Sequence, residues 1–297
     1  MDRFGVYMNH PISRRNFLKN LFLSLLTLIG ITTSGVLYAR KIEPNWLSIT
    51  SHNISSKLIP KSFNNVTILQ FSDTHVGFQY QLKNLRKTVK IINQLRPDIV
   101  VFTGDLIDQP LEFSEQAQVQ ISRILSQIQA PLGKYAVYGN HDYGGYGKNF
   151  YKTIINQSEF TLLTNANDYI YNEQNESIRI AGIDDPIFGS PNFEQTFQHI
   201  KKNEFCIFLS HAPDLADEAS KYPVTLQLSG HSHGGQIQIP LLGPLITPSY
   251  AENYLEGMYN IDGIKLYVNR GLGTTRLPLR FLSRPEISLF TLQSSKL

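Results

Sequence analysis

The sequence has only one cysteine among its 297 residues. A single thiol cannot cross-link the chain to itself, so a disulfide framework is excluded as a source of stability. Cys206 stands inside the apolar run 205–209, where its expected role is that of a small buried side chain. The chain also lacks internal repeats and low-complexity segments. It therefore has the composition of a globular protein with a large core.

The folded part also lacks an excess of positive charge, although the whole chain carries a formal net charge of +3. Of the 27 basic and 24 acidic residues, six and one respectively lie in residues 1–41. The remaining 21 basic and 23 acidic residues give the rest of the chain a charge of −2. Nucleic-acid binding requires a basic surface that neutralises phosphates, so nucleic acid is not an expected partner.

Residues 1–39 have the composition of an export signal. The segment 13–19 (SRRNFLK) precedes an apolar stretch over residues 21–38. The arginine pair followed by Phe-Leu-Lys resembles a twin-arginine signal, with a Sec signal as the alternative. The twin-arginine export machinery is therefore a predicted partner. The cell wall, the extracellular space or the outer face of the membrane is the predicted location.

The apolar stretch does not settle whether the signal is removed. A membrane-spanning helix needs about 20 mostly apolar residues. Threonine, serine and glycine dilute residues 21–38, which makes this stretch marginal as a permanent span. Cleavage and membrane association through residues 21–38 both stay open.

Residues 40–65 are predicted to be a lead-in segment with an edge strand at 46–50, and residues 66–297 a single domain. Helices are predicted from residue 82, where apolar residues recur at helical spacing, and over 114–128, with Ser114 as the N-cap. Strands are predicted at 66–71, 99–103, 135–138, 178–183, 205–209, 225–228, 236–239, 266–268 and 287–292. The alternation predicts α/β layering in the first half, and the later strands predict a second, mixed sheet.

Five of the predicted strands are each followed directly by polar residues. These residues are Asp73 and His75; Asp105; Asn140, His141 and Asp142; His211; and His231 and His233. Ligands of open α/β sheets bind beyond the carboxyl ends of the strands. The five segments are therefore expected to form one polar site.

The residue types in these segments indicate a metal site. Asp73 and His75, like His231 and His233, are two residues apart, so on an extended backbone both side chains of a pair reach the same metal. Glycine stands at positions 104, 139 and 230, where the backbone is expected to turn tightly. Carboxylate, imidazole and amide ligands without thiolate suit Mn, Fe or Zn in a catalytic site.

These motifs resemble those of the calcineurin-like metallophosphoesterase family from about residue 60 to the end. The similarity extends to the YkuE-type branch exported by the twin-arginine route. It includes the signal, the segments 139–147 (GNHDYGGYG) and 230–236 (GHSHGGQ), and the tail 269–280. The resemblance implies an α/β fold of the four-layer α/β/β/α type, with two mixed sheets and the site at one edge.

The resemblance also implies two divalent metal ions (Mn, Zn or Fe) and their ligands. The first metal would be held by Asp73, His75 and His233, and the second by Asn140, His211 and His231, with Asp105 bridging both. His141 would donate a proton to the leaving group, and Asp142 would orient His141.

Two features beside these motifs allow alternative interpretations. Arginines stand at 270, 276, 280 and 284 in a segment without acidic residues. Arg276 is the preferred candidate for binding the substrate phosphate, and a structural or solvated role is the alternative. Residues 240–248 follow the last histidines and are expected to form a packed loop. An apolar wall beside a lipid or polymer substrate is the alternative.

Together these observations predict an exported phosphoesterase with two metal ions that hydrolyses phosphate esters in the cell envelope, with a diester favoured over a monoester. The alternative is a pyrophosphatase that acts on UDP-2,3-diacylglucosamine-like precursors of lipid A. A non-catalytic scaffold is disfavoured, because such proteins lose ligands or the proton donor, and here all are present.

Overall fold

The computed structural model describes residues 13–110, 113–144 and 147–295. The first twelve residues of the predicted signal and residues 145–146 of the glycine-rich segment lie outside this part of the chain.

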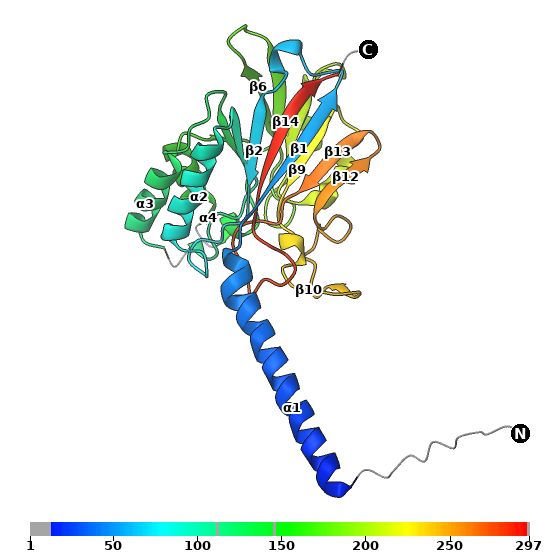
Figure 1. Cartoon of the computed structure of the whole chain (residues 1–297). Helices are drawn as coiled ribbons and strands as arrows, with labels where there is room; N and C mark the ends of the chain where they lie inside the picture. The colour runs from blue at the N-terminus through cyan, green and yellow to red at the C-terminus, as the bar shows by residue number, and fades with distance from the viewer. Residues whose placement is uncertain (1–12, 111–112, 145–146, 296–297) are drawn as a thin grey trace, which may run out of the picture.

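Two six-stranded sheets form the body of the domain (Figure 1). The first sheet has the order β1-β14-β2-β3-β4-β5, and the second has the order β12-β13-β9-β8-β7-β6. Each sheet contains parallel and antiparallel pairs, as predicted. The strands of the first sheet are β1 (Ser48–Ser56), β2 (Thr67–Phe71), β3 (Ile99–Phe102), β4 (Lys134–Ala136), β5 (Thr161–Leu162) and β14 (Glu286–Ser294). Those of the second are β6 (Ala166–Tyr171), β7 (Ser177–Gly182), β8 (Cys206–Leu209), β9 (Leu226–Ser229), β12 (Gly257–Ile261) and β13 (Ile264–Val268).

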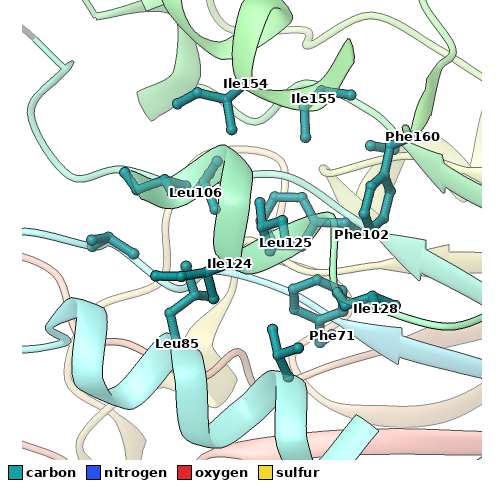
Figure 2. Close-up of a cluster of buried hydrophobic side chains, with 14 of the residues drawn as sticks. Phe71, Leu85, Phe102, Leu106, Ile124, Leu125, Ile128, Ile154, Ile155 and Phe160 are labelled. Carbon is teal, nitrogen blue, oxygen red and sulfur yellow. The ribbon is translucent and has the colours of Figure 1, made fainter. Parts of the chain in front are cut away.

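The two sheets pack face to face, because alternate side chains of each strand point to opposite faces. In β2, Ile68 belongs to the apolar layer between the sheets, whereas Leu69 belongs to the layer under the helices. The helix-side layer joins residues of the first sheet, such as Phe71 and Phe102, to helix residues such as Ile124 (Figure 2). The layer order helix, sheet, sheet, helix confirms the predicted α/β fold.

Three helices cover the outer face of the first sheet: α2 (Leu82–Leu95), α3 (Glu115–Leu125) and α4 (Gly147–Gln157) (Figure 1). The predicted apolar face of α2 is buried, and Ser114 caps α3 by accepting a hydrogen bond from the Ala117 amide at 3.3 Å. The sequence analysis did not predict α4. Ile154 and Ile155 of α4 are fully buried against the same core.

The outer face of the second sheet packs against two short helices, α5 (Phe193–Thr196) and α6 (Ala216–Ala219). Cys206 of β8 is fully buried in this layer, as predicted, and burial raises the pKa of its thiol to about 12. The strands β6 and β12, which were not predicted, form the two edges of this sheet. Edge strands are half solvated, and their polar side chains give little apolar signal in the sequence.

The lead-in segment contributes an edge strand to the first sheet. The predicted strand at 46–50 overlaps β1 only at residues 48–50, and β1 continues to Ser56 and pairs in parallel with β14 along its full length. Glu43, upstream of β1, is fully buried and accepts a hydrogen bond from the Ser283 amide at 2.6 Å. Part of residues 40–65 is therefore built into the same sheet as the residues that follow.

A 24-residue helix, α1 (Arg14–Leu37), extends away from the domain, and none of its residues is buried (Figure 1). A π-helical turn (Tyr38–Ile42) links it to the domain. Within the described part of the chain, α1 with its following turns is long and apolar enough to cross a membrane by length and composition. A signal sequence meets the same criteria, so α1 is a candidate for either role.

Residues 237–248 form a small hairpin outside both large sheets. Its strands are β10 (Gln238–Ile239) and β11 (Gly243–Pro244), which pair with each other, and a backbone bond from Gln238 to Phe281 joins the hairpin to the tail. The expectation of a packed loop here is wrong. Leu241 and Leu242 at the tip have relative exposures of 106% and 80%, so the described residues leave the tip uncovered.

Candidate metal centre

Five strands bring the predicted site residues to one edge of the two sheets. In the first sheet β2, β3 and β4 are parallel, and they are followed by Asp73 and His75, by Asp105, and by Asn140 and His141. In the second sheet β8 and β9 are parallel, and they are followed by His211 and by His231 and His233. Because the sheets pack face to face, the ends of both strand sets meet.

The backbone at these residues differs from the extended form expected from the sequence. Asp73, His75, Asp105, His231 and His233 all have positive φ angles, between 43° and 70°. Such left-handed conformations are uncommon for residues other than glycine and concentrate at functional sites. The paired ligands therefore converge through tight turns that follow the strands.

The glycines between the strands and the ligands act mainly through the space they leave. Gly104 has a φ of +96° and does meet the predicted need for an unusual turn. Gly139 and Gly230 do not have the positive φ angle that only such a turn would require. An added Cβ at Gly139 would overlap Asp105 Oδ1, and one at Gly230 would overlap Ser72 Oγ and Asp73 Oδ2. These two positions exclude a side chain because ligand carboxylates occupy the space.

One group of buried side chains consists of Asp73, His75 and His233, whose ligand atoms all lie within 4.8 Å of one another. His75 Nε2 lies 3.0 Å from His233 Nε2. His233 Nε2 lies 3.6 Å from Asp73 Oδ1. Two imidazole nitrogens and a carboxylate oxygen thus face a common point.

A second buried group consists of Asp105, His211 and His231, within the same 4.8 Å limit. Asp105 Oδ2 lies 3.3 Å from His211 Nε2, and His231 Nδ1 lies 3.1 Å from the same nitrogen. Asp105 Oδ2 also lies 3.5 Å from His75 Nε2 of the first group. Asp105 therefore stands between the two groups.

Three histidines direct one ring nitrogen into the site because the other is held by a protein oxygen. His211 Nδ1 donates to the Thr103 carbonyl at 2.6 Å, and His231 Nε2 donates to the Ser249 carbonyl at 2.9 Å. His75 Nδ1 donates to Asp108 Oδ1 at 3.2 Å. Such outer hydrogen bonds fix the orientation and tautomer of metal-binding imidazoles.

Burial and neighbouring charges set the protonation of the site. Burial and the charge of His211 lower the pKa of His231 to about 3, and burial, His75 and Arg280 hold the pKa of His233 well below its usual range. Both rings are therefore neutral, which is the form that binds metals. Burial lowers the pKa of His211, but the charges of Asp105 and Asp73 outweigh this and raise it to about 10.

The donor set fits divalent metal ions. Asn140 Oδ1 is buried and has no hydrogen-bond partner among the described residues. A buried carbonyl oxygen without a partner is costly, and a cation would satisfy it. The same cations would separate the facing nitrogens of His75 and His233. These donors are the nitrogen and oxygen set without thiolate from which the sequence analysis predicted Mn, Fe or Zn.

His141 stands at the rim of the two groups rather than inside them. It is 29% exposed, and its backbone amide donates to Asp105 Oδ1 at 2.8 Å. Its Nδ1 donates to the Asp108 carbonyl oxygen at 2.9 Å. Burial lowers the pKa of His141, but the charge of Asp105 and the bond to Asp108 outweigh it and raise that pKa above its usual value.

The prediction that Asp142 orients His141 is corrected by the hydrogen bonds of Asp142. Its carboxylate accepts from the backbone amides of Gly139 and Asp105, each at 2.9 Å, and of Leu106 at 3.0 Å. A buried carboxylate beside unpaired amides bonds to them first, and here it fixes the turns that carry the predicted ligands.

The sequence analysis assigned no role to Asp108, which contacts both His75 and His141. Its position three residues after Asp105 was the available signal.

The site opens into a pocket that Arg276 lines together with Asp105, Asn140 and His141. The other three arginines of the tail are engaged elsewhere. Arg270 pairs with Glu286 at 2.9 Å, Arg280 is fully buried, and Arg284 lies over the ring of Trp46. Arg276 has an exposed side chain and is the arginine of this set that faces the pocket.

Part of the lining of this pocket is apolar. The hairpin and the tail supply it through Ile237, Leu245, Ile246, Pro248 and Leu277. Predicted metal ligands and aliphatic side chains in the lining of one pocket suit a ligand with a charged head and an apolar portion.

Comparison with known proteins agrees with this geometry. Residues 66–235 match the family described as calcineurin-like phosphoesterase. The chain is 45% identical to the uncharacterized metallophosphoesterase YkuE of Bacillus subtilis, over 96% of this chain and 99% of that protein. It is 28% identical to the UDP-2,3-diacylglucosamine pyrophosphatase LpxG of Chlamydia trachomatis, over 90% and 95% of the two chains. It is 26% identical to the phosphodiesterase YaeI of Escherichia coli, over 95% and 99%.

The family match covers more than half of the chain and contains the five strand ends that carry the predicted ligands. A relative of almost equal length supports the same assignment. The protein therefore belongs to the calcineurin-like phosphoesterase family of metal-dependent phosphoric ester hydrolases.

Proposed function

We propose that this enzyme hydrolyses phosphate esters, diesters in preference to monoesters, in the cell envelope. The observation that supports the proposal is the convergence of six potential ligands in two groups, with Asp105 between the groups and Asn140 lining the same pocket. Relatives named as a metallophosphoesterase and a phosphodiesterase cover nearly the whole chain.

In this proposal Asp73, His75 and His233 bind one divalent ion, and Asn140, His211 and His231 bind the other. Asp105 would be shared by both ions, because its Oδ2 lies 3.5 Å from His75 Nε2 of one group and 3.3 Å from His211 Nε2 of the other. Two such ions, which we take to be Mn, Zn or Fe, supply Lewis acidity and lower the pKa of water at the site.

The residues around this centre have complementary roles. His141 donates the proton that the leaving oxygen requires, from Nε2, because its Nδ1 is bonded to the Asp108 carbonyl. The charge of Asp105 and the bond to Asp108 raise the pKa of His141 above its ordinary value, which favours the protonated form that can donate. Arg276 lines the same pocket and binds the phosphate, because its guanidinium can donate two parallel hydrogen bonds to two non-bridging oxygens.

The proposed location follows from the N-terminal segment. The residues SRRNFLK lead directly into α1, whose apolar side chains are exposed. We infer that the twin-arginine machinery exports the protein. This route carries folded proteins and would therefore allow metal to be bound before export. The exported protein is either retained on the outer face of the membrane by α1 or released to the cell wall.

The second candidate function is a pyrophosphatase reaction on UDP-2,3-diacylglucosamine-like precursors of lipid A. A relative with this activity in its name aligns with 90% of the chain. The apolar wall formed by Leu245, Ile246 and Leu277 would accommodate acyl chains.

The test is to strip the purified full chain of metal, restore Mn, Zn or Fe separately, and measure turnover of a diester, a monoester and a UDP-linked acylated glucosamine. We expect metal-dependent turnover that is highest with the diester. Highest turnover of the UDP-linked compound would favour the second candidate. Absence of metal-dependent turnover on every substrate would overturn the proposed function.

A further inference from the structure

The tip of the hairpin at residues 237–248 is unusually apolar for a solvent-exposed turn. Such turns are normally rich in Gly, Asn, Asp and Ser, but here Pro240, Leu241 and Leu242 connect β10 to β11. Leu245 and Ile246, just after β11, are also exposed. No charged residue occurs between residues 234 and 251. Contiguous exposed apolar side chains of this kind mark an interaction surface.

The hairpin lies next to the point where α1 leaves the domain. The Arg280 amide donates to the Ala39 carbonyl at 2.9 Å, and the Phe281 ring contacts the Tyr38 ring edge-on. Phe281 also contacts the start of the hairpin through its backbone. Its amide donates to the Gln236 carbonyl at 3.0 Å, and its carbonyl accepts from the Gln238 amide at 2.9 Å. Figure 1 shows α1 and β10 at the same end of the domain.

The residues around this contact continue the same pattern. Leu277 and Leu282, on either side of Arg280, are exposed apolar side chains. Arg40 and Lys41, directly after α1, have exposed basic side chains. Basic residues at the end of an apolar helix are placed to contact anionic lipid headgroups. A helix of 24 residues is about 36 Å long, enough to cross the hydrocarbon layer.

We propose that residues 237–248 form a membrane-docking hairpin, whose apolar tip enters a lipid bilayer beside α1 and holds the mouth of the metal pocket at the level of the lipid headgroups. The occupant of this surface is a bilayer because the apolar side chains are continuous with an apolar helix of membrane-spanning length. The basic residues lie where that helix ends.

This arrangement selects a class of substrate, a step that rests on the proposed phosphoesterase function. Leu245, Ile246 and Leu277 are exposed and also line the pocket. An acyl chain that leaves the bilayer along these residues brings its phosphate to Arg276 and the metal ligands. The substrates are therefore phosphate esters of lipids, presented from the membrane rather than from solution.

The docking is tested without any measurement of activity. A fluorophore sensitive to its environment is attached to Leu242→Cys in the full chain, which is reconstituted in vesicles containing anionic lipid and spin-labelled acyl chains. Cys206 is fully buried, so the native thiol does not compete for the label. The matched control is Tyr171→Cys, an exposed residue of β6. Figure 1 labels β6 at the end of the domain opposite α1.

We expect the fluorescence emission of the label at position 242 to shift to shorter wavelength and to be quenched by the spin-labelled lipids. The emission of the label at position 171 should show neither change. Equal behaviour of the two labels would overturn the proposal. A shift without lipid quenching would also overturn it, because a protein surface rather than a bilayer would then cover the tip.

A second experiment separates docking from catalysis. Leu241 has a φ of 71°, which asparagine tolerates, so the double variant Leu241→Asn and Leu242→Asn can keep the hairpin. Neither residue lines the pocket. We expect turnover of a soluble phosphate diester to be unchanged and turnover of an acyl-chain phosphate ester in vesicles to fall at least about tenfold. If the double variant kept the same fraction of the unaltered chain's turnover on both substrates, the docking role would be overturned. No turnover by the unaltered chain would overturn the phosphoesterase function but leave the fluorescence result standing.

Discussion

The Asp108 carboxylate accepts a hydrogen bond from His75 Nδ1 at 3.2 Å, and this bond directs His75 Nε2 toward the metal ligands. The backbone carbonyl of the same residue accepts from His141 Nδ1 at 2.9 Å. Asp108 therefore orients two histidines with different proposed roles, one a ligand and one a proton donor.

We expect Asp108→Asn to weaken metal binding or turnover by about 10- to 100-fold, the usual effect of losing a carboxylate behind a metal-binding imidazole. The backbone carbonyl is kept, so His141 should remain in place. Metal content and kcat measured at several metal concentrations check this. A variant with normal metal affinity and normal kcat would show that the bond to His75 is dispensable.

Asp105→Asn should lose metal and nearly all turnover, because the neutral amide cannot bridge two cations. The matched control is Asp262→Asn in the turn between β12 and β13, where a φ of 44° suits asparagine. Metal analysis and turnover of a diester provide the readout. Two bound metals and full activity in Asp105→Asn would refute the bridging assignment.

His141→Ala should retain its metals and lose about 10²- to 10⁴-fold in kcat, the usual contribution of a proton donor. The loss should shrink as the leaving group becomes a weaker base, because such a group needs no proton in order to depart. A series of aryl phosphate esters with graded leaving groups measures this. The same loss across the whole series would argue against proton donation by His141.

Metal affinity should increase with pH because His211 must lose a proton to bind metal. Its pKa in the metal-free fold is about 10, above the ordinary 6.5. The protonated ring therefore stabilises the metal-free fold fully below pH 6.5, and this stabilisation is lost as pH rises through about 10. Each metal bound at His211 then releases a proton at neutral pH, and affinity should rise about tenfold per pH unit. Competition with a chelator at pH 6, 7 and 8 measures the slope. An affinity that does not change with pH would contradict the assigned protonation of His211.

Gly139→Ala should lower the free energy of unfolding by about 1–3 kcal/mol and weaken metal binding, because the new methyl group would overlap Asp105 Oδ1. Gly35→Ala in α1 is the matched control, because an added Cβ there meets nothing within 4 Å. Thermal unfolding with and without metal compares the two variants. Equal stability and metal affinity in both would show that the space at Gly139 is not required.

Local patterns in the sequence were sufficient for elements with a strong apolar signal. The buried strands β2, β3, β8 and β9 lie within two residues of their predicted bounds because they are short apolar runs, and α2 begins at its predicted residue because its apolar side chains recur at helical spacing. Weaker elements were missed. The edge strands β6 and β12 are fixed by backbone pairing with β7 and β13, and pairing leaves no pattern in one segment alone.

The sequence by itself determined the ligand types, their order and their position after strands, because residues such as His231 and Asp105 occur in short polar segments after apolar runs. Only the tertiary structure decided how these residues converge, through left-handed turns rather than extended backbone. It also decided that Asp142 bonds to backbone amides while Asp108 contacts His75 and His141. Hydrogen-bond partners and exposed surfaces depend on contacts between segments far apart in the chain, and no local pattern specifies them.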